Sequence, residues 1–265
     1  MHSRSTRVGA LFVVAAVLAL TWSADSSDDL LAKLGGALKI GMWHTFSYLK
    51  TIQLRVAVDY RDPVTWHFLL DQVAAEHSGE YCMAQVCDIW DYCREHWRCV
   101  KDPTLPFDQF SRASEAVAAG LRGDCDDFAV LVASGIRVVD GTALIVCEHT
   151  AEDAHAFNLV FIGVRHRDVV CGLTYVLLRH DIDPERLRSD DLGLFCDEEG
   201  RFWLNLDWTA PHPGGPRWTD FSKVTRSYAL PIPSILWLLL HPLLKVPEPP
   251  PECTEYLQRM ALPKG

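Results

Sequence analysis

Cys125 stands among three aspartates in the stretch Gly123-Asp124-Cys125-Asp126-Asp127, directly before an almost wholly apolar run. Asp124 is of the residue type that caps helix N-termini, which would place Cys125 at the first helical position and Asp127 at the third, as in a capping box. A thiol there faces unpaired backbone N–H groups and the positive end of the helix dipole, and both lower its pKa. The aspartates oppose the thiolate. A nucleophilic Cys125 would therefore depend on a cationic partner.

His155 and Asp207 are the partners that such a thiol would need, because a cysteine nucleophile uses a base and the base uses an orienting group. His155 opens the run AHAFNLVFI, and Asp207 closes the run WLNLD. His149 is the nearest competing base, but no aromatic residue follows it at the same spacing. We therefore predict Cys125 as nucleophile, His155 as general base and acid, and Asp207 as the orienting carboxylate. The alternative for Cys125 is a buried structural cysteine.

Helices are expected mainly before the Cys125 helix and strands after it. Capping and breaker residues predict helices over 62–75, 79–97, 114–121 and 125–139, the last stopped at Gly141. Runs rich in β-branched residues predict strands over 142–147, 156–162, 169–178 and 202–206. This order indicates an α+β fold in which a central buried helix carrying Cys125 packs on an antiparallel β-sheet.

Three motifs in chain order resemble the transglutaminase-like superfamily, a papain-like group. The G-x-C-x-[DE]-x-A block is similar to residues 123–129, the H-A-[WYF] strand to residues 155–157, and the W-x-x-x-D motif to residues 203–207. HWRCVKDP and SRASEAVAAGLRGDCDD look like the lead-in of a bacterial exported subgroup with a GDCDD block. The resemblance covers roughly 81–209.

The resemblance implies acyl transfer from an amide of a protein or peptide, through a thioester on Cys125, to water or an amine. Trp97 and Asp124 are the further residues expected on the substrate or oxyanion side, and no cofactor is implied. Ala154 stands where the subgroup has glycine, and Asn158 where an acidic residue is common, so substrate specificity stays open. A catalytically silent binding or scaffolding domain at the membrane is the alternative.

Metal binding is not expected. Neighbouring carboxylates on one helical turn should point in different directions, which argues against a shared ion at the three aspartates. Among nine cysteines, Cys82, Cys87, Cys93 and Cys99 are spaced five, six and six apart, which is not a zinc pattern. Core packing is favoured for these four, with disulfides second.

The ends of the chain suggest export. The 265 residues carry a net charge of -10, which argues against a nucleic-acid partner. Arg4 and Arg7 precede an apolar run, and acidic residues follow it, so 1–24 is interpreted as a signal peptide or signal anchor that leaves the bulk of the chain outside the cytoplasm. We expect a helical lead-in over 25–78, a transglutaminase-like domain over 79–212 and an apolar, proline-rich segment over 213–265. Its block 229–245 could associate with the membrane, the favoured interpretation, or cover the core.

Overall fold

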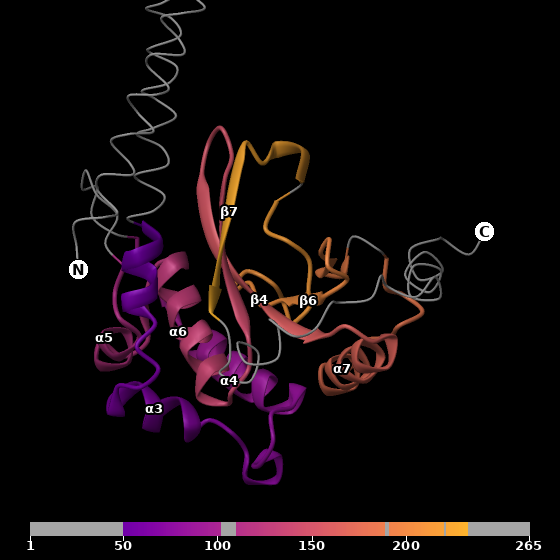
Figure 1. Ribbon diagram of the computed structural model, residues 1–265, viewed down its shortest axis with the longest axis horizontal. Helices are drawn as coiled ribbons and strands as arrows, with labels where there is room; N and C mark the ends of the chain where they lie inside the picture. Colours follow the sequence, from indigo (N-terminus) through magenta and orange to yellow (C-terminus); the bar gives the residue numbers. More distant parts are fainter. Residues whose placement is uncertain (1–49, 102–109, 189–190, 220, 233–265) are drawn as a thin grey trace, which may run out of the picture. The chain divides into compact units, whose positions relative to one another are not determined.

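The computed structural model describes residues 50–101, 110–188, 191–219 and 221–232 (Figure 1). The chain divides into two units, residues 1–53 and 54–265, and of the first only the helical residues 50–53 are described. The expected signal segment 1–24 and most of the apolar block 229–245 lie outside these ranges. Within them, no helix combines the length and the hydropathy that crossing a membrane requires.

A five-stranded antiparallel sheet lies at the centre of the second unit. Its strands are β3 (Ala143–His149), β4 (Ala154–Gly163), β5 (Leu194–Cys196), β6 (Phe202–Asn205) and β7 (Arg226–Ile232), in the order β5-β6-β4-β3-β7. Every neighbouring pair is antiparallel. The expected α+β class with an antiparallel sheet is therefore confirmed.

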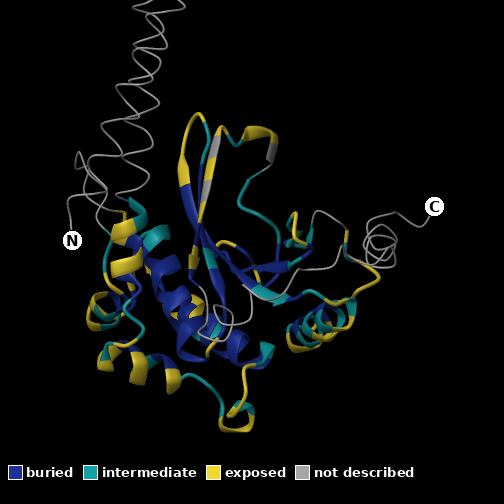
Figure 2. Ribbon diagram, in the orientation of Figure 1, coloured by how far each residue is buried: buried dark blue, intermediate teal, exposed yellow. Residues whose placement is uncertain are grey.

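Helices cover one face of this sheet around α6. They are α3 (Pro63–Leu70), α4 (Met83–His96), α5 (Ala113–Ala118) and α6 (Cys125–Val138), with the short turns η1 (Ala75–His77) and η3 (Phe221–Lys223) elsewhere in the chain. The helix α6 packs on β3 and β4 and also meets α3, α4 and α5 (Figure 1). It is buried from Asp127 to its end (Figure 2). The prediction of a central buried helix behind Cys125 is confirmed.

The strand predicted over 169–178 is wrong, because this segment belongs to the helix α7 (His166–Arg179). Its β-branched residues favoured a strand. Its buried residues are Val169, Leu173 and Val176, whose spacing of four and three places them on one face of a helix. That periodicity was the better signal, and α7 packs against α4 and β4.

Two strands of the five-stranded sheet were not predicted. The strand β7 starts at Arg226 and runs into the apolar block 229–245, and its residues Leu230 and Ile232 join the core. Pro231 is tolerated because β7 is an edge strand of the sheet. The described part of the block thus covers the core, which was the less favoured interpretation. The strand β5 is only three residues long and forms the other edge.

Helix ends differ from the expectations by several residues. Asp62 caps α3 as predicted, accepting a hydrogen bond from the backbone N–H of Val64, but the helix ends at Leu70. The helix α4 begins at Met83. After α6, Asp140 takes the left-handed conformation with φ of 60°, a role expected of Gly141.

The four spaced cysteines have different environments. Cys87 and Cys93 are buried in the core beside Val86, Ile89 and Trp90, as predicted. Cys82 is only partly buried and Cys99 is exposed, so core packing is wrong for Cys99. No disulfide joins any two of the eight cysteines in the described ranges, which are these four together with Cys125, Cys147, Cys171 and Cys196.

Candidate functional site

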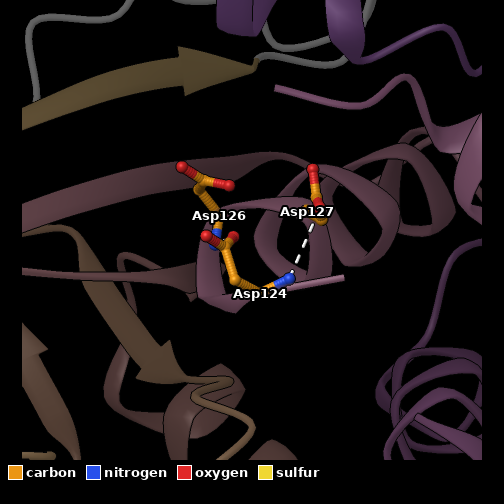
Figure 3. Close-up of side chains that lie close together, drawn as sticks. All are labelled: Asp124, Asp126 and Asp127. Carbon is orange, nitrogen blue, oxygen red and sulfur yellow. Dashed lines mark hydrogen bonds between the residues drawn. The ribbon is translucent and has the colours of Figure 1, made fainter. Parts of the chain in front are cut away.

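The tip of α6 is capped by aspartates. Asp124 has extended backbone angles, and its carboxylate accepts the Asp126 N–H at 3.1 Å. The Asp127 carboxylate accepts the backbone N–H of Ser111 at 2.8 Å. It also accepts the backbone N–H of Asp124 at 3.4 Å (Figure 3). A Cβ on residue 123 would lie 2.3 Å from Oδ2 of Asp127, so the position requires glycine. The predicted capping box is confirmed.

The three aspartates also lie closer together than expected. One carboxylate oxygen from each of Asp124, Asp126 and Asp127 can be chosen so that all lie within 4.8 Å, so the expectation that they diverge is wrong. Burial raises the pKa of Asp127, and the nearby charge of Asp124 adds to that shift, whereas the Ser111 N–H opposes it. Two of the three carboxylates accept backbone hydrogen bonds as helix caps.

The Cys125 thiol sits at the start of α6, partly buried against the core. Burial raises its pKa to about 12, the charges of Asp126 and Asp124 add to the rise, and a hydrogen bond from the backbone N–H of Ala156 opposes it. The net direction is opposite to the lowering expected from the helix terminus. The thiol also contacts the backbone N–H of Ala156, the residue that follows His155.

His155 and Asp207 form a buried pair. The imidazole Nε2 lies 3.0 Å from both Oδ1 and Oδ2 of Asp207. His155 is 9% exposed and Asp207 is 0% exposed. Asp207 also accepts the backbone N–H of Thr209 at 2.9 Å, so its carboxylate is held on two sides. A carboxylate at Nε2 favours the tautomer that carries its proton there and leaves Nδ1 as the basic nitrogen.

Buried hydrogen bonds hold the three segments of the site together. The Asn158 side chain on β4 donates to the backbone oxygen of Ala129 on α6 at 3.0 Å. The Trp90 indole on α4 donates to the backbone oxygen of Leu206, next to Asp207, at 3.1 Å. Asn158 is 0% exposed, so its side chain belongs to the core and joins β4 to the helix.

The structure places the remaining predicted residues around this core. Trp97 follows α4 and packs edge-on against Phe128 in the first turn of α6, with ring centroids 5.3 Å apart. The two-residue strands β1 (Arg98–Cys99) and β2 (Arg122–Gly123) pair in parallel and bring this segment to the start of α6. The indole N–H of Trp97 has no hydrogen-bond partner within the described ranges. The competing base His149 lies at the end of β3, opposite Ala154.

Sequence reasoning missed three residues beside His155. Glu148, its cross-strand neighbour on β3, is buried and ion-paired with Arg217. The Trp218 ring lies against the imidazole, with ring centroids 4.9 Å apart at 47°. The one signal in the sequence was an acidic residue, Glu148, near the end of the apolar run ALIVCEH, and it does not identify a partner. Arg217 and Trp218 carried none, because their segment is a proline- and glycine-rich loop.

Comparison with known proteins gives no identity. No family model matches this chain, and neither the curated proteins nor the solved structures contain a match.

Proposed function

We propose that this protein transfers acyl groups from amides through a thioester on Cys125, with His155 as general base and acid and Asp207 as its orienting partner. The buried pair of His155 and Asp207 is the observation that carries the proposal, since it lies next to the amide that contacts the Cys125 thiol. A transglutaminase-like fold is part of the same proposal. The antiparallel sheet with α6 buried against it supports that fold.

The proposed reaction uses Nδ1 of His155, the ring nitrogen that does not contact Asp207. Nδ1 of His155 takes the thiol proton, directly or through one water, and the thiolate forms a bond to the carbonyl carbon of the amide. The tetrahedral intermediate expels the amine, which takes that proton from His155, and a thioester remains. Water or a second amine then gives a proton to His155 and attacks the thioester carbonyl, the C–S bond breaks to release the acid or the new amide, and His155 passes the proton to the Cys125 sulfur. Backbone N–H groups at the start of α6 are suited to bind the oxyanion.

The raised pKa of Cys125 decides how the thiol is activated. A thiol with a pKa of about 12 is neutral at physiological pH, so helix-terminus activation alone leaves almost no thiolate. Activation therefore requires proton transfer to His155 as the substrate binds. The raised pKa of Cys125 is also the observation behind the second candidate function. A thiol that never gives its proton to His155 would leave a binding domain that has the fold but no activity.

Acylation by a small activated ester tests the proposal without knowledge of the substrate. The parent protein is mixed with p-nitrophenyl acetate, and peptide mass spectrometry locates the acetyl group. We expect a hydroxylamine-sensitive acetyl thioester at Cys125 with a burst of nitrophenol. Cys125→Ser and His155→Ala should abolish both signals.

The exposed Cys171 supplies the internal control, because acetylation there reports ordinary thiol reactivity. Added primary amines then separate hydrolysis from amine transfer by the product that leaves the thioester. A parent protein that acetylates Cys171 faster than Cys125, with no burst, would contradict the proposal and leave the silent binding domain.

A further inference from the structure

The imidazole of His155 is enclosed by more than its carboxylate partner. Trp218 lies against it at 4.9 Å, and Phe157, two residues along β4, lies 6.2 Å away with the two rings inclined by 21°. Both separations are within the range of favourable aromatic contacts. The Trp218 ring is therefore placed to limit rotation of the imidazole and the access of water to its bond with Asp207.

Glu148 fixes the position of Trp218. The indole Nε1 of Trp218 donates to Oε2 of Glu148 at 3.1 Å, and the Arg217 guanidinium pairs with Oε1 of the same carboxylate. The Glu148 side chain is 4% exposed. A buried carboxylate with both oxygens occupied has one stable orientation, because leaving either oxygen unpaired costs desolvation energy.

The loop before Trp218 is anchored independently. The Asn205 side chain at the end of β6 donates to the backbone oxygens of Gly215 at 3.0 Å and Pro216 at 3.1 Å. The Arg217 guanidinium also lies over the Phe195 ring at 5.4 Å. Arg217 and Trp218 thus reach Glu148 from a fixed backbone.

We propose that Glu148, with Arg217, is a positioning residue that acts through Trp218 to hold His155 in the orientation and tautomer set by Asp207. The proposal rests on the proposed function for its catalytic consequence. The positioning itself is a property of the folded protein and can be measured without any reaction.

The same sheet contains a matched control. Trp203 donates its indole N–H to Oδ2 of Asp197 at 2.8 Å, and Arg201 pairs with that oxygen at 2.6 Å. The Trp203 ring of this second set lies 5.5 Å from the Phe161 ring, and within the described ranges no ring contact joins Trp203 to His155. Asp197→Asn removes the same kind of charge as Glu148→Gln, from a carboxylate that is more exposed.

Nitrogen NMR of the imidazole reads the positioning directly. In protein labelled with ¹⁵N-histidine, we expect parent His155 to show one tautomer, with the proton on Nε2. Glu148→Gln and Trp218→Ala should give a tautomer mixture and slow the acetylation of Cys125 by about tenfold, since small misplacements of catalytic groups have effects of that order or larger. Trp218→Phe, which keeps a ring beside the imidazole, should fall between parent and Trp218→Ala.

Thermal unfolding of each variant separates positioning from folding. Asp197→Asn should leave the His155 spectrum and the acetylation rate unchanged. Folded Glu148→Gln and Trp218→Ala proteins with a parent spectrum would overturn the proposal, as would an equal change in Asp197→Asn. If Glu148→Gln does not fold, an unaltered spectrum in both Trp218→Phe and Trp218→Ala would overturn the proposal in the same way. If the variants show the expected tautomer mixtures but neither they nor the parent protein is acetylated at Cys125, the proposed function is contradicted and the positioning role is not.

Discussion

The imidazole Nε2 of His155 lies 3.0 Å from both carboxylate oxygens of Asp207, although 52 residues separate the two in the sequence. The pair is buried between β4 and the end of β6, where the Trp90 indole and the Asn158 side chain secure the surrounding backbone. Asp207 fixes the orientation of the imidazole and leaves Nδ1 of His155 free to accept a proton. His155 is next in sequence to Ala156, whose backbone N–H contacts the Cys125 thiol.

Replacement of Asp207 by asparagine should remove most of the reactivity of Cys125. The amide can donate to Nε2 and so favour the wrong imidazole tautomer, and the imidazolium loses its counter-charge. We expect the rate of acetylation by p-nitrophenyl acetate to fall at least about 100-fold, the lower end of what general acid–base catalysis contributes. Asp153→Asn, an exposed change two residues before His155, is the control and should retain the parent rate. Equal rates in the two variants would contradict this role of Asp207.

The Cys125 thiol should make the stability of the fold depend on alkaline pH. Its pKa rises from the ordinary 9.0 to about 12 in the folded state because of burial. Above pH 9 the unfolded chain has lost a proton that the folded chain keeps, so the stabilisation is present below pH 9 and is lost as the pH rises toward 12.

Urea unfolding at pH 8, 9 and 10 measures this effect. The advantage of the parent over Cys125→Ser should shrink as the pH rises, whereas Cys171→Ser, at an exposed position, should follow the parent. A difference between parent and Cys125→Ser that stays constant with pH would show that the folded thiol titrates normally.

The Asp124 cap should contribute measurably to stability. Its carboxylate accepts the Asp126 N–H, so Asp124→Ala leaves that donor without its cap and should lower the free energy of unfolding by about 1 kcal/mol. Asp124→Asn keeps an acceptor oxygen and should remain within a few tenths of a kcal/mol of the parent. Urea unfolding at neutral pH distinguishes the two. Equal losses in both variants would assign the effect to charge and not to capping.

Gly172 tests the helix α7 in the segment first predicted to be a strand. A Cβ at this position would have Met83 Cε as its nearest neighbour, at 3.7 Å, which is ordinary contact. Alanine in a helix interior is favoured over glycine, so Gly172→Ala should stabilise the protein by about 0.5–1 kcal/mol. Gly120→Ala is the contrast, since φ of 78° strains any side chain there, and it should destabilise. A destabilising Gly172→Ala would contradict the helix.

Local signals predicted the parts of the fold that depend on neighbouring residues. Asp62 and Asp124 were recognisable as helix caps, and the apolar runs of β3, β4 and β6 were recognisable as strands. The helix α7 was missed because its β-branched residues favoured a strand. The helical spacing of Val169, Leu173 and Val176 stands out only once these three are known to be its buried residues. The strand β7 was missed because it contains Pro231, which is compatible with a strand only at a sheet edge.

The candidate site divides in the same way. Cys125, His155 and Asp207 could be proposed from residue type and chain order. Glu148 and Trp218 could not, since 70 residues separate them and the pairing depends on how the loop after β6 returns to β3. The raised pKa of Cys125 was also out of reach, because it results from burial, which outweighs the helix terminus.

Alkylation of Cys125 by iodoacetamide near neutral pH tests the central claim most directly. Cys99 and Cys171 are exposed and serve as references within the same molecule. If His155 takes the thiol proton as the reagent approaches, Cys125 should react faster than both references despite its burial and raised pKa, and His155→Ala should reduce its rate below theirs. Reaction of Cys125 that is slower than that of Cys99 and Cys171, and unchanged in His155→Ala, would contradict a nucleophilic Cys125.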